Sequence, residues 1–595
     1  MSKMFSLEEN FDIDCLLDTY GSSKDFDSAV GGNIAKQTHL HETEDLGKSG
    51  DINSLCSGHR LYQQNIAEEE LLLSTYQQEQ QLQLFSHFRT LDDLYLDIVS
   101  PPFQLSGKEI SKVVSFQSED LKVIKSKKEK AIISPSASLK ILKNYGNRFQ
   151  RLNGEKINLP GNDIVSTKVS DQKLSAGAII RLAGEKFIQS CSQMVDEVLV
   201  VDHSYPNSFL GLSDEEMKDV ELLQCLLASA EKVAQQQFDR ASKDLNQCDD
   251  SSSDKGTPIQ RLVYYFSEAL REKIDRETGK VTLKGLGKKW LLELEEAMMS
   301  PNPTCISVYQ NVPFVQVSVF TGVQTVVDNV AKARKVHVIY LEIRGGMHCT
   351  VLMSTLAARR EYPLEHLKIT AIGTRSKPKI VETGKRLISF AQSINLSFSF
   401  KIVMVADMLD LNEDLFELDY EEVVVVYSPY LLRTMISWPD RLECLMKVMR
   451  NINPCVMVVI ESEANHNSPS FVKRFIEAVF FYGAFFDSLE DCMCHDEQNR
   501  MIAESMYFSP AIRNIVAAEG EERTMRHVNF NVWRDFFARF GMVEMDLSML
   551  SLNQADMMLK DFACGSSCTL DLDGKSLIIG WKGTPIHSFS AWKFL

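Results

Sequence analysis

The run VHVIYLEI at 336–343 is the first of five short β-rich segments that decide the fold. The other four are LKITAIGT (367–374), FSFKIVMV (398–405), EEVVVVYS (421–428) and CVMVVIES (455–462). Helical patterns occur between or after them, near 347–361, 379–394, 439–450 and 469–487. Strands that are apolar on both faces and alternate with helices indicate a parallel sheet built from right-handed crossovers. The sequence therefore predicts an α/β fold with a doubly wound, Rossmann-like core.

The last part of the sheet is expected to differ from the first. VEMDLS (543–548), CTLDLD (568–573) and SLIIGWK (576–582) have strand composition, and no long helix separates the last two. Asp573-Gly574 has the residues of a tight hairpin turn. We therefore predict an antiparallel C-terminal hairpin, with Trp581 and Trp592 as buried anchors of the closing sheet.

A helical segment precedes the sheet. Ser213-Asp-Glu-Glu216 has the pattern of a capping box, which starts a helix. Apolar residues then recur every three or four positions up to Cys248, and between 230 and 238 two steps of four follow each other, which is the doubled step of four. This spacing fits an amphipathic helix packed in a bundle, or a coiled coil between molecules that is locally unwound at the doubled step. Further helical patterns at 258–276 and 286–299 complete an expected α-helical cap.

Residues 1–174 are expected to form a largely disordered regulatory region. Residues 1–60 scatter large apolar side chains among acidic ones, which is typical of a segment that docks a short helix into a partner, or of an untethered terminus. A Gln-rich stretch at 66–98 follows, and 121–160 then carries ten Lys or Arg against two Glu. The tightest basic cluster is Lys125, Lys127, Lys128 and Lys130. It fits a nuclear-import signal, a DNA-contacting arm or a solvated linker, and folded structure should resume near 175.

The composition is that of a globular protein with a sizeable core. Of 595 residues, 44% are hydrophobic, and the formal charge of −17 makes the whole molecule repel phosphate. The thirteen cysteines and the start MSKMFSLEEN, which lacks a basic and apolar leader, favour reduced thiols in the cytosol or nucleus. The most apolar stretches are too short or too interrupted to span a bilayer, so no membrane association is expected.

The core offers little for cofactor chemistry. The loop after the first strand contains Glu342, Gly345 and Gly346, but the full G-x-G-x-x-G pattern is absent. The second strand ends at Gly373 without the acid that would bind ribose hydroxyls, which leaves Asp407 as the nearest suitable carboxylate. These four residues, Glu342, Gly345, Gly346 and Asp407, are weak cofactor candidates. Packing against a helix is the favoured role for the two glycines.

Other catalytic templates also fail. The sequence has no P-loop with its required glycine spacing, no G-x-S-x-G elbow and no H-E-x-x-H helix. Cys492-Met-Cys494-His495 lacks a matching second pair that would complete a zinc site. We therefore expect no catalytic residue, no metal and no cofactor, and the protein is not expected to be an enzyme.

Five collinear blocks resemble the GRAS family of plant transcriptional regulators. The blocks are 219–248 (first leucine-rich region), 313–361 (VHIID-like region), 367–405 (second leucine-rich region), 468–490 (PFYRE-like region) and 511–595 (SAW-like region). Within them, Val336, His337 and Ile339 match the VHIID motif, and Ser590, Ala591 and Trp592 match the triplet that names the SAW region. The resemblance covers 213–595. It departs from the family pattern at Tyr340, Gly345 and Cys349.

The resemblance implies a nuclear regulator whose methyltransferase-like core and helical cap serve protein association. The domain looks closest to DELLA-like or DELLA-interacting members, although the N-terminal region lacks the DELLA and VHYNP motifs. Expected partners are other GRAS or DELLA proteins and transcription factors, in a homo- or heterodimer, with hormone or root-symbiosis signalling as family-level contexts. DNA contact is expected to be indirect.

Three functions compete at this point. The preferred one is a co-regulator that pairs through the exposed side of 219–248, with Leu223, Leu227 and Leu245 as the contact residues. The second is direct promoter binding by a GRAS dimer, in which basic residues of 523–539 or the Lys122–Lys130 cluster contact phosphates. The third is a methyltransferase-like protein that binds a small ligand at the Gly345-Gly346 loop.

Overall fold

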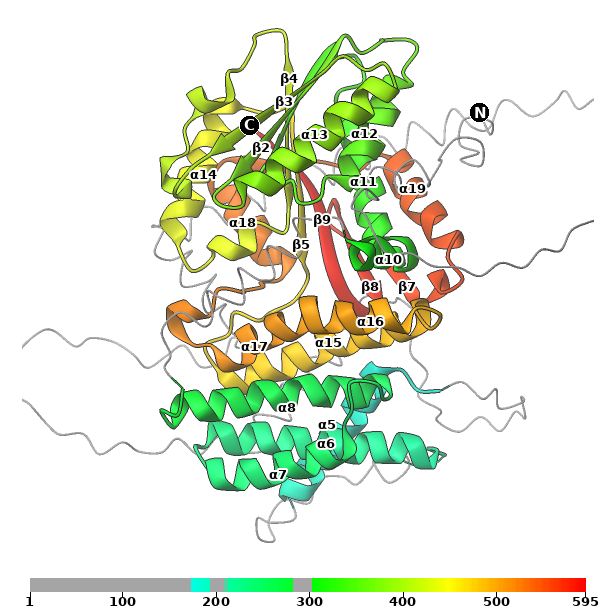
Figure 1. Ribbon diagram of the computed structural model, residues 1–595, viewed down its shortest axis with the longest axis vertical. Helices are drawn as coiled ribbons and strands as arrows, with labels where there is room; N and C mark the ends of the chain where they lie inside the picture. Colours follow the sequence, from blue (N-terminus) through cyan, green and yellow to red (C-terminus); the bar gives the residue numbers. More distant parts are fainter. Residues whose placement is uncertain (1–172, 193–208, 210, 282–301) are drawn as a thin grey trace, which may run out of the picture. The chain divides into compact units, whose positions relative to one another are not determined.

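The computed structural model describes residues 173–192, 209, 211–281 and 302–595, all of which fall in one contact unit, 90–595. In the described residues, nine strands form one mixed sheet in the order β3-β2-β1-β4-β5-β9-β8-β7, with β6 paired to β9 (Figure 1). The strands are β1 (Lys335–Tyr340), β2 (His366–Gly373), β3 (Phe398–Met404), β4 (Val423–Pro429), β5 (Val456–Ser462), β6 (Met542–Glu544), β7 (Cys568–Asp573), β8 (Ser576–Trp581) and β9 (Thr584–Phe594).

The first five strands are parallel, and their order confirms the predicted doubly wound core. β1 lies between β2 and β4, so the strand order reverses at the β1–β4 pair. Every residue of β5 is buried, and β1 is buried from Val336 onward, because helices cover both faces of the sheet. In such sheets, ligands bind beside the carboxyl ends of the strands at the point of reversal.

Helices cover the sheet on both sides. One face packs against α11 (Pro313–Asn329), α12 (Met347–Ala357), α13 (Lys377–Ser393) and α19 (Met549–Lys560), which share one apolar core with it. The other face packs against α14 (Pro439–Ile452), α18 (Phe530–Arg539) and the short helices η1 (Met408–Asp410), η2 (Glu413–Phe416) and η3 (Leu432–Met435). This arrangement is a three-layer α/β/α core.

A helical bundle forms a third apolar core (Figure 1). Its members are α5 (Ala176–Ser192), α6 (Asp214–Ala234), α7 (Phe238–Ser251), α8 (Pro258–Glu277), α15 (Phe471–Cys492) and α17 (Ser509–Ala517). Beside it lie α10 (Pro303–Asn311), α16 (Glu497–Ala503), η4 (Glu504–Phe508) and η5 (Gly520–Glu522). The last short helix, η6 (Gly565–Ser567), follows α19 in the chain and contacts it. The expected helical cap is therefore present, and α5 adds a helix before the expected start of the domain at 213.

A buried ion pair joins two parts of the bundle. Arg261 in α8 is 1% exposed, and its Nε donates to Oε1 of Glu504, which is fully buried, over 3.0 Å. Arg500 donates to the same carboxylate oxygen, also over 3.0 Å. The other nitrogens of Arg261 donate to the Gly256 and Phe486 carbonyls and to Glu490. The Arg261 guanidinium therefore fixes α8 against α15 and η4.

The periodic segment 213–248 is two helices and not one. The capping box is present, with Ser213 accepting from the Glu216 N–H and Glu216 accepting from the Ser213 N–H. The chain then breaks at Gln235–Gln237, where Gln236 adopts φ of +60°, and α7 folds back on α6. The doubled step of four in the apolar pattern coincides with this break. The bundle interpretation is thus correct, and the long coiled coil is wrong.

The antiparallel end of the sheet is confirmed, but its longest strand was not predicted. β7 and β8 form the expected hairpin, with Gly574 in the left-handed region at φ +64°. β9 pairs with β5, β6 and β8, and so connects the parallel and antiparallel halves. Trp592 of β9 is buried against Phe537, with ring centroids 4.7 Å apart, and Trp581 of β8 is also buried.

Several expectations fall outside the described residues. These are residues 1–172 of the region 1–174 that was predicted to be disordered, the basic cluster Lys125, Lys127, Lys128 and Lys130, and the predicted helix at 286–299. Among the helices that the structure does describe, none combines the length and apolar character that crossing a membrane requires.

Candidate functional site

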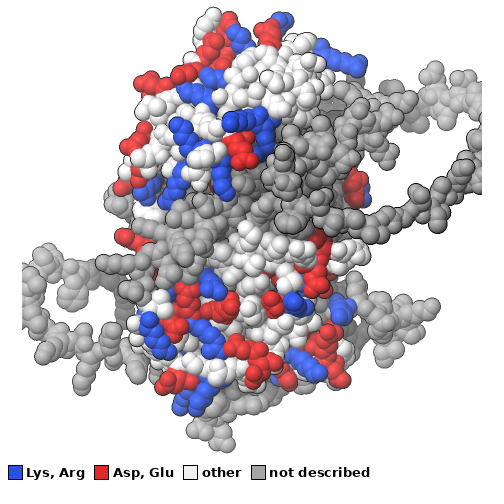
Figure 2. Space-filling view, viewed as in Figure 1, with Lys and Arg blue, Asp and Glu red and all other residues white. Residues whose placement is uncertain are grey.

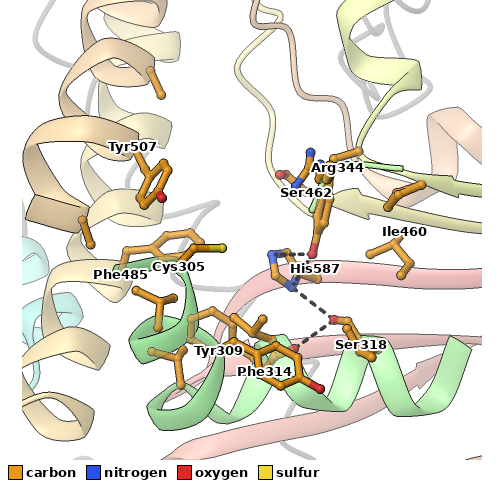
Figure 3. Close-up of a pocket in the computed structure, with 18 of the residues that line it drawn as sticks. Cys305, Tyr309, Phe314, Ser318, Arg344, Ile460, Ser462, Phe485, Tyr507 and His587 are labelled. Carbon is orange, nitrogen blue, oxygen red and sulfur yellow. Dashed lines mark hydrogen bonds between the residues drawn. The ribbon is translucent and has the colours of Figure 1, made fainter. Parts of the chain in front are cut away.

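A cavity of about 300 Å³ lies at the carboxyl ends of β1, β4 and β5, where the strand order reverses. Its walls come from α10, α11, the loop between β1 and α12, the segment after β4, and the helices α15, η4 and α17. Figure 3 shows Arg344, Ser462 and Ile460 on one side, with Tyr507, Phe485 and Cys305 across from them. The cavity therefore occupies the position at which doubly wound proteins bind ligands.

Most of the cavity wall is apolar or aromatic. Phe485, Tyr507 and Phe508 pack against both the bundle core and the core on one face of the sheet, so they form the boundary between the two. Phe314 of α11 meets Phe485 edge to face at 5.5 Å between centroids. Such a wall suits a ligand that is largely hydrocarbon.

Two arginines give one part of the cavity a positive charge. The guanidinium carbon of Arg344 lies 4.8 Å from the centroid of the Tyr430 ring, and that of Arg433 lies 5.4 Å from the same centroid. Arg433 Nη1 donates to the Ser462 hydroxyl over 2.9 Å. The Nε of each arginine is buried and has no hydrogen-bond partner in the described part of the chain.

Two carboxylates lie near these arginines. Glu342 Oε2 is 3.6 Å from Arg344 Nη2, a long and weak pairing. Glu461 in β5 accepts from the backbone N–H groups of Leu432 and Arg433. Burial raises the pKa of Glu461 to about 7, which the nearby Arg433 only partly offsets. Because burial favours the protonated form of Glu461, this carboxyl offsets less of the positive charge of Arg344 and Arg433.

His587 of β9 is the central polar group of the site. Tyr430 Oη lies 3.2 Å from its Nε2, and Ser318 Oγ lies 3.3 Å from its Nδ1 (Figure 3). Burial, together with the charges of Arg433 and Arg344, lowers the pKa of His587 to about 3. The Ser318 hydroxyl donates to the Phe314 carbonyl. A histidine this weakly basic is a poor general base for Ser318, so the pair does not constitute an activated nucleophile.

Two further polar atoms of the wall are buried without a partner among the described residues. They are the Tyr427 hydroxyl and His527 Nε2, and both side chains are 2% exposed. Burial lowers the pKa of His527 well below its ordinary value and raises that of the Tyr427 phenol, so both groups stay neutral. A buried polar atom that lacks a partner costs free energy, and a ligand can recover that cost by bonding to it.

The structure separates the four cofactor candidates. Gly345 and Gly346 line the cavity, whereas Glu342 and Asp407 do not. Gly346 adopts φ of +71° at the start of α12, and a Cβ there would lie 2.8 Å from the Thr383 methyl of α13. The glycine thus permits both the turn and the close approach of α13.

Asp407 is committed to a structural role. Its carboxylate receives two bonds from Arg441, 2.7 Å from Nε and 2.5 Å from Nη2, and it caps η1 through the Leu409 N–H. Hydrogen bonding from Arg441 holds the pKa of Asp407 at about 2. The carboxylate is therefore not free to bind ribose hydroxyls.

The predicted partner-contact leucines are wrong. Leu223, Leu227 and Leu245 are 0%, 6% and 0% exposed, because the apolar stripe of α6 and α7 packs into the bundle core. The outward side of these helices is polar, with exposed Lys218, Glu221 and Lys243. A stripe of leucines at helical spacing is what a buried face requires, so it does not identify a contact surface.

Three of the four arginines of 523–539 are also unsuited to phosphate contact. Arg523 and Arg526 are buried and donate to backbone carbonyls, and Arg534 pairs with Glu544 and Asp573.

The motif residues Val336, His337 and Ile339 lie buried in β1, and Ser590, Ala591 and Trp592 lie buried in β9.

Sequence reasoning missed the residues that define the cavity. Arg344 immediately precedes Gly345 and Gly346 in the loop after the first predicted strand. Tyr430 and Arg433 lie within five residues of the end of the fourth predicted strand, where a doubly wound sheet places ligand-binding groups. These positions could have been found. His587 could not, because only the pairing of β9 with β5 brings it to the site.

The comparisons with known proteins agree with the fold. The model of the GRAS domain family matches residues 222–593. DELLA protein RGL3 of Arabidopsis thaliana is 30% identical over 376 residues, 63% of this chain and 69% of that protein. DELLA protein 2 of Medicago truncatula is 28% identical over 439 residues, 73% of this chain and 79% of that protein.

A solved structure supports the same fold. The crystal structure of SCL7 in Oryza sativa aligns with a TM-score of 0.54 at 24% identity, and covers 62% of this chain and 99% of that one. The match to the family model includes the nine described strands except the last residue of β9, and it includes the helical bundle from within α6 onward. This chain belongs to the GRAS domain family.

Proposed function

We propose that this protein is a nuclear regulator of transcription that acts through association of its GRAS domain with other GRAS-domain proteins or with DNA-binding factors. The observation that carries the proposal is the family match over residues 222–593, together with relatives that are DELLA proteins. The site chemistry agrees with it, because Asp407 is bound by Arg441 and His587 is too weak a base to activate Ser318.

The outward side of α19 is the surface that best suits association. Met549, Leu550 and Met557 are exposed on this helix, with Met549 at 70% and Met557 at 54%, while its other side packs on α11. Exposed large apolar side chains gathered on one helix mark an interaction site, and methionine adapts its shape to a partner. We assign this side of α19 to a second GRAS domain, in a homo- or heterodimer.

The test is co-purification of the full chain with itself and with a DELLA protein. Met549→Asp combined with Met557→Asp should weaken association at least tenfold, because two charges would have to be buried in an apolar contact. Leu409→Asp is the matched control, since Leu409 is 51% exposed in η1. Unchanged association of the double variant, with an unchanged circular dichroism spectrum, would exclude α19 as the contact.

Nuclear import is assigned to the basic cluster. Replacing Lys125, Lys127, Lys128 and Lys130 with alanine in a fluorescent fusion should move the protein out of the nucleus. A four-alanine change of the exposed basic residues Arg375, Lys377, Lys385 and Lys447 is the control for loss of charge. Nuclear accumulation of the Lys125–Lys130 variant would contradict the assignment.

Direct DNA binding is the second candidate, and one observation favours it. Figure 2 shows basic side chains gathered where α13 lies. From 375 to 386 the chain carries Arg375, Lys377, Lys379, Lys385 and Arg386 against Glu382 alone. Such a local cluster could contact phosphate despite the overall charge of −17.

A gel shift across a salt series tests the second candidate. If α13 contacts DNA, Lys377→Glu with Lys385→Glu should reduce both the affinity and the salt dependence, by a slope of about 1 for each lost phosphate contact. Absence of any shift at low salt would leave association as the route to promoters.

A further inference from the structure

The cavity joins an apolar space to a cationic end. Its volume of about 300 Å³ lies at the lower end of the range for small-molecule sites, roughly 300–1,000 Å³. Phe314, Phe485 and Tyr507 form part of the apolar wall, and Arg344 and Arg433 meet at the Tyr430 ring. The side chain of Arg344 is 21% exposed, so this end of the cavity reaches solvent.

The cationic end has unused binding capacity. The buried Nε atoms of Arg344 and Arg433 lack partners in the described chain, and Arg433 uses Nη1 for the Ser462 hydroxyl, which carries no charge. The opposing carboxylates are Glu342, 3.6 Å from Arg344, and Glu461, whose burial favours its protonated form. Two largely buried guanidinium groups with so little negative charge nearby are suited to bind an anion, and arginine matches a carboxylate through two parallel bonds.

We propose that this cavity binds a small, largely hydrocarbon molecule that carries one carboxylate. The hydrocarbon part lies against Phe314, Phe485 and Tyr507, and the carboxylate accepts from Arg344 and Arg433 at the solvent end. The Tyr427 hydroxyl and His527 Nε2, both buried without a partner in the described residues, are each available to bond to a hydroxyl or carbonyl oxygen on the ligand. No covalent step is involved.

The bound molecule also links the two parts of the fold. Phe485, Tyr507 and Phe508 belong to the bundle side of the cavity, whereas Arg344 and Arg433 follow strands of the sheet. A ligand that contacts both sides stabilises their packing, and because it binds the folded state alone, it stabilises that state increasingly as its free concentration rises above Kd.

The test is titration calorimetry on the full chain with two probe acids, decanoate and pyrene-1-butyrate, and with decanol as the uncharged match for decanoate. At least one acid should bind saturably at one site and raise the melting temperature, and decanol should bind at least tenfold more weakly than decanoate. Arg344→Met and Arg433→Met should each weaken binding of that acid about tenfold, whereas Arg344→Lys should retain part of the affinity. Arg334→Met, in an exposed ion pair outside the cavity, is the control.

A third kind of variant separates binding in the cavity from binding elsewhere. Val319→Trp fills the cavity from α11 and should abolish binding of the acid while the circular dichroism spectrum is retained. The proposal is overturned if neither acid binds, if decanol binds as well as decanoate, or if binding is unchanged by Arg344→Met or by Val319→Trp. None of these outcomes bears on association through α19, which is measured without the acids.

Discussion

Replacing Arg261 with methionine tests whether the buried ion pair holds the bundle to η4. The substitution keeps most of the side-chain volume but removes all the bonds that the guanidinium makes, including those to the Gly256 and Phe486 carbonyls. Among the described residues, Glu504 then keeps Arg500 as its cationic partner, within a site where burial already raises the pKa of the carboxyl.

The expected cost is large because the pair is desolvated. Removing one partner of a buried pair typically costs about 3–5 kcal/mol, since the remaining charge is left without compensation. Arg500 reduces that cost, and the two carbonyls that lose their donor add to it at about 1–3 kcal/mol each where water does not reach them. We therefore expect Arg261→Met to lower the free energy of unfolding by about 4 kcal/mol.

The assay is urea unfolding, followed by circular dichroism, of the wild type, Arg261→Met, Glu504→Gln and the double variant. Because the two side chains interact directly, the double variant should be destabilised by about 1–3 kcal/mol less than the sum of the single effects. Lys560→Met is the matched control: its i,i+4 pair with Asp556 is exposed, and its loss should cost no more than about 0.5 kcal/mol. Destabilisation by Arg261→Met of less than 1 kcal/mol, or strict additivity in the double variant, would refute the reasoning.

Two further predictions concern Trp592 and the buried histidines. Trp592→Ala should lower the free energy of unfolding by about 3–5 kcal/mol and abolish function by unfolding, because the Trp592 ring packs on Phe537 and Phe530. A soluble variant that melts cooperatively at the wild-type temperature yet lacks activity would instead make Trp592 a contact residue. Burial lowers the pKa of His337, His466 and His587 to about 3 each. Between pH 6.5 and pH 3 these histidines therefore bind protons in the unfolded chain but not in the folded protein, so their contribution to stability is present above pH 6.5 and is lost as the pH falls toward 3. The loss is up to about 1.4 kcal/mol per histidine per pH unit. Glu461, with its pKa raised to about 7, and Asp219, with its pKa raised to about 6, act in the opposite sense and lose their contribution as the pH rises. Burial also lowers the pKa of His348 to about 4 and that of His527 well below its ordinary value, so the buried histidines outnumber these two carboxylates and the melting temperature should fall between pH 7 and pH 5.5. A melting temperature that rises over this interval would contradict the histidine assignment.

The parallel half of the sheet was predictable because its strands carry their own signal. β1, β4 and β5 are apolar on both faces and are separated by helices, so local sequence alone indicates a covered parallel sheet. β9 gives no such signal: Ser588 and Ser590 alternate with Phe589 and Ala591, and their burial depends on neighbours from β5 and β8. A strand whose environment is set by distant partners cannot be recognised from its own residues.

The candidate site shows the same limit. The spacing of Leu223 and Leu227 correctly places them on one face of a helix, but spacing does not say whether that face meets solvent or the core. Arg344 and Arg433 follow different strands, and they lie together only because β1 and β4 are neighbours in the sheet. The chemistry of the cavity is therefore a product of topology, and the residues become informative once strand order is known.

The position of β9 has a consequence for synthesis in the cell. β5 ends at Ser462, but the strand that covers its free edge begins only at Thr584. At about 5–20 residues per second, a ribosome takes roughly 6–24 s to add the intervening segment. During that interval the edge of β5 lacks the strand that pairs with it in the finished domain, and an unpaired apolar edge of this kind favours aggregation.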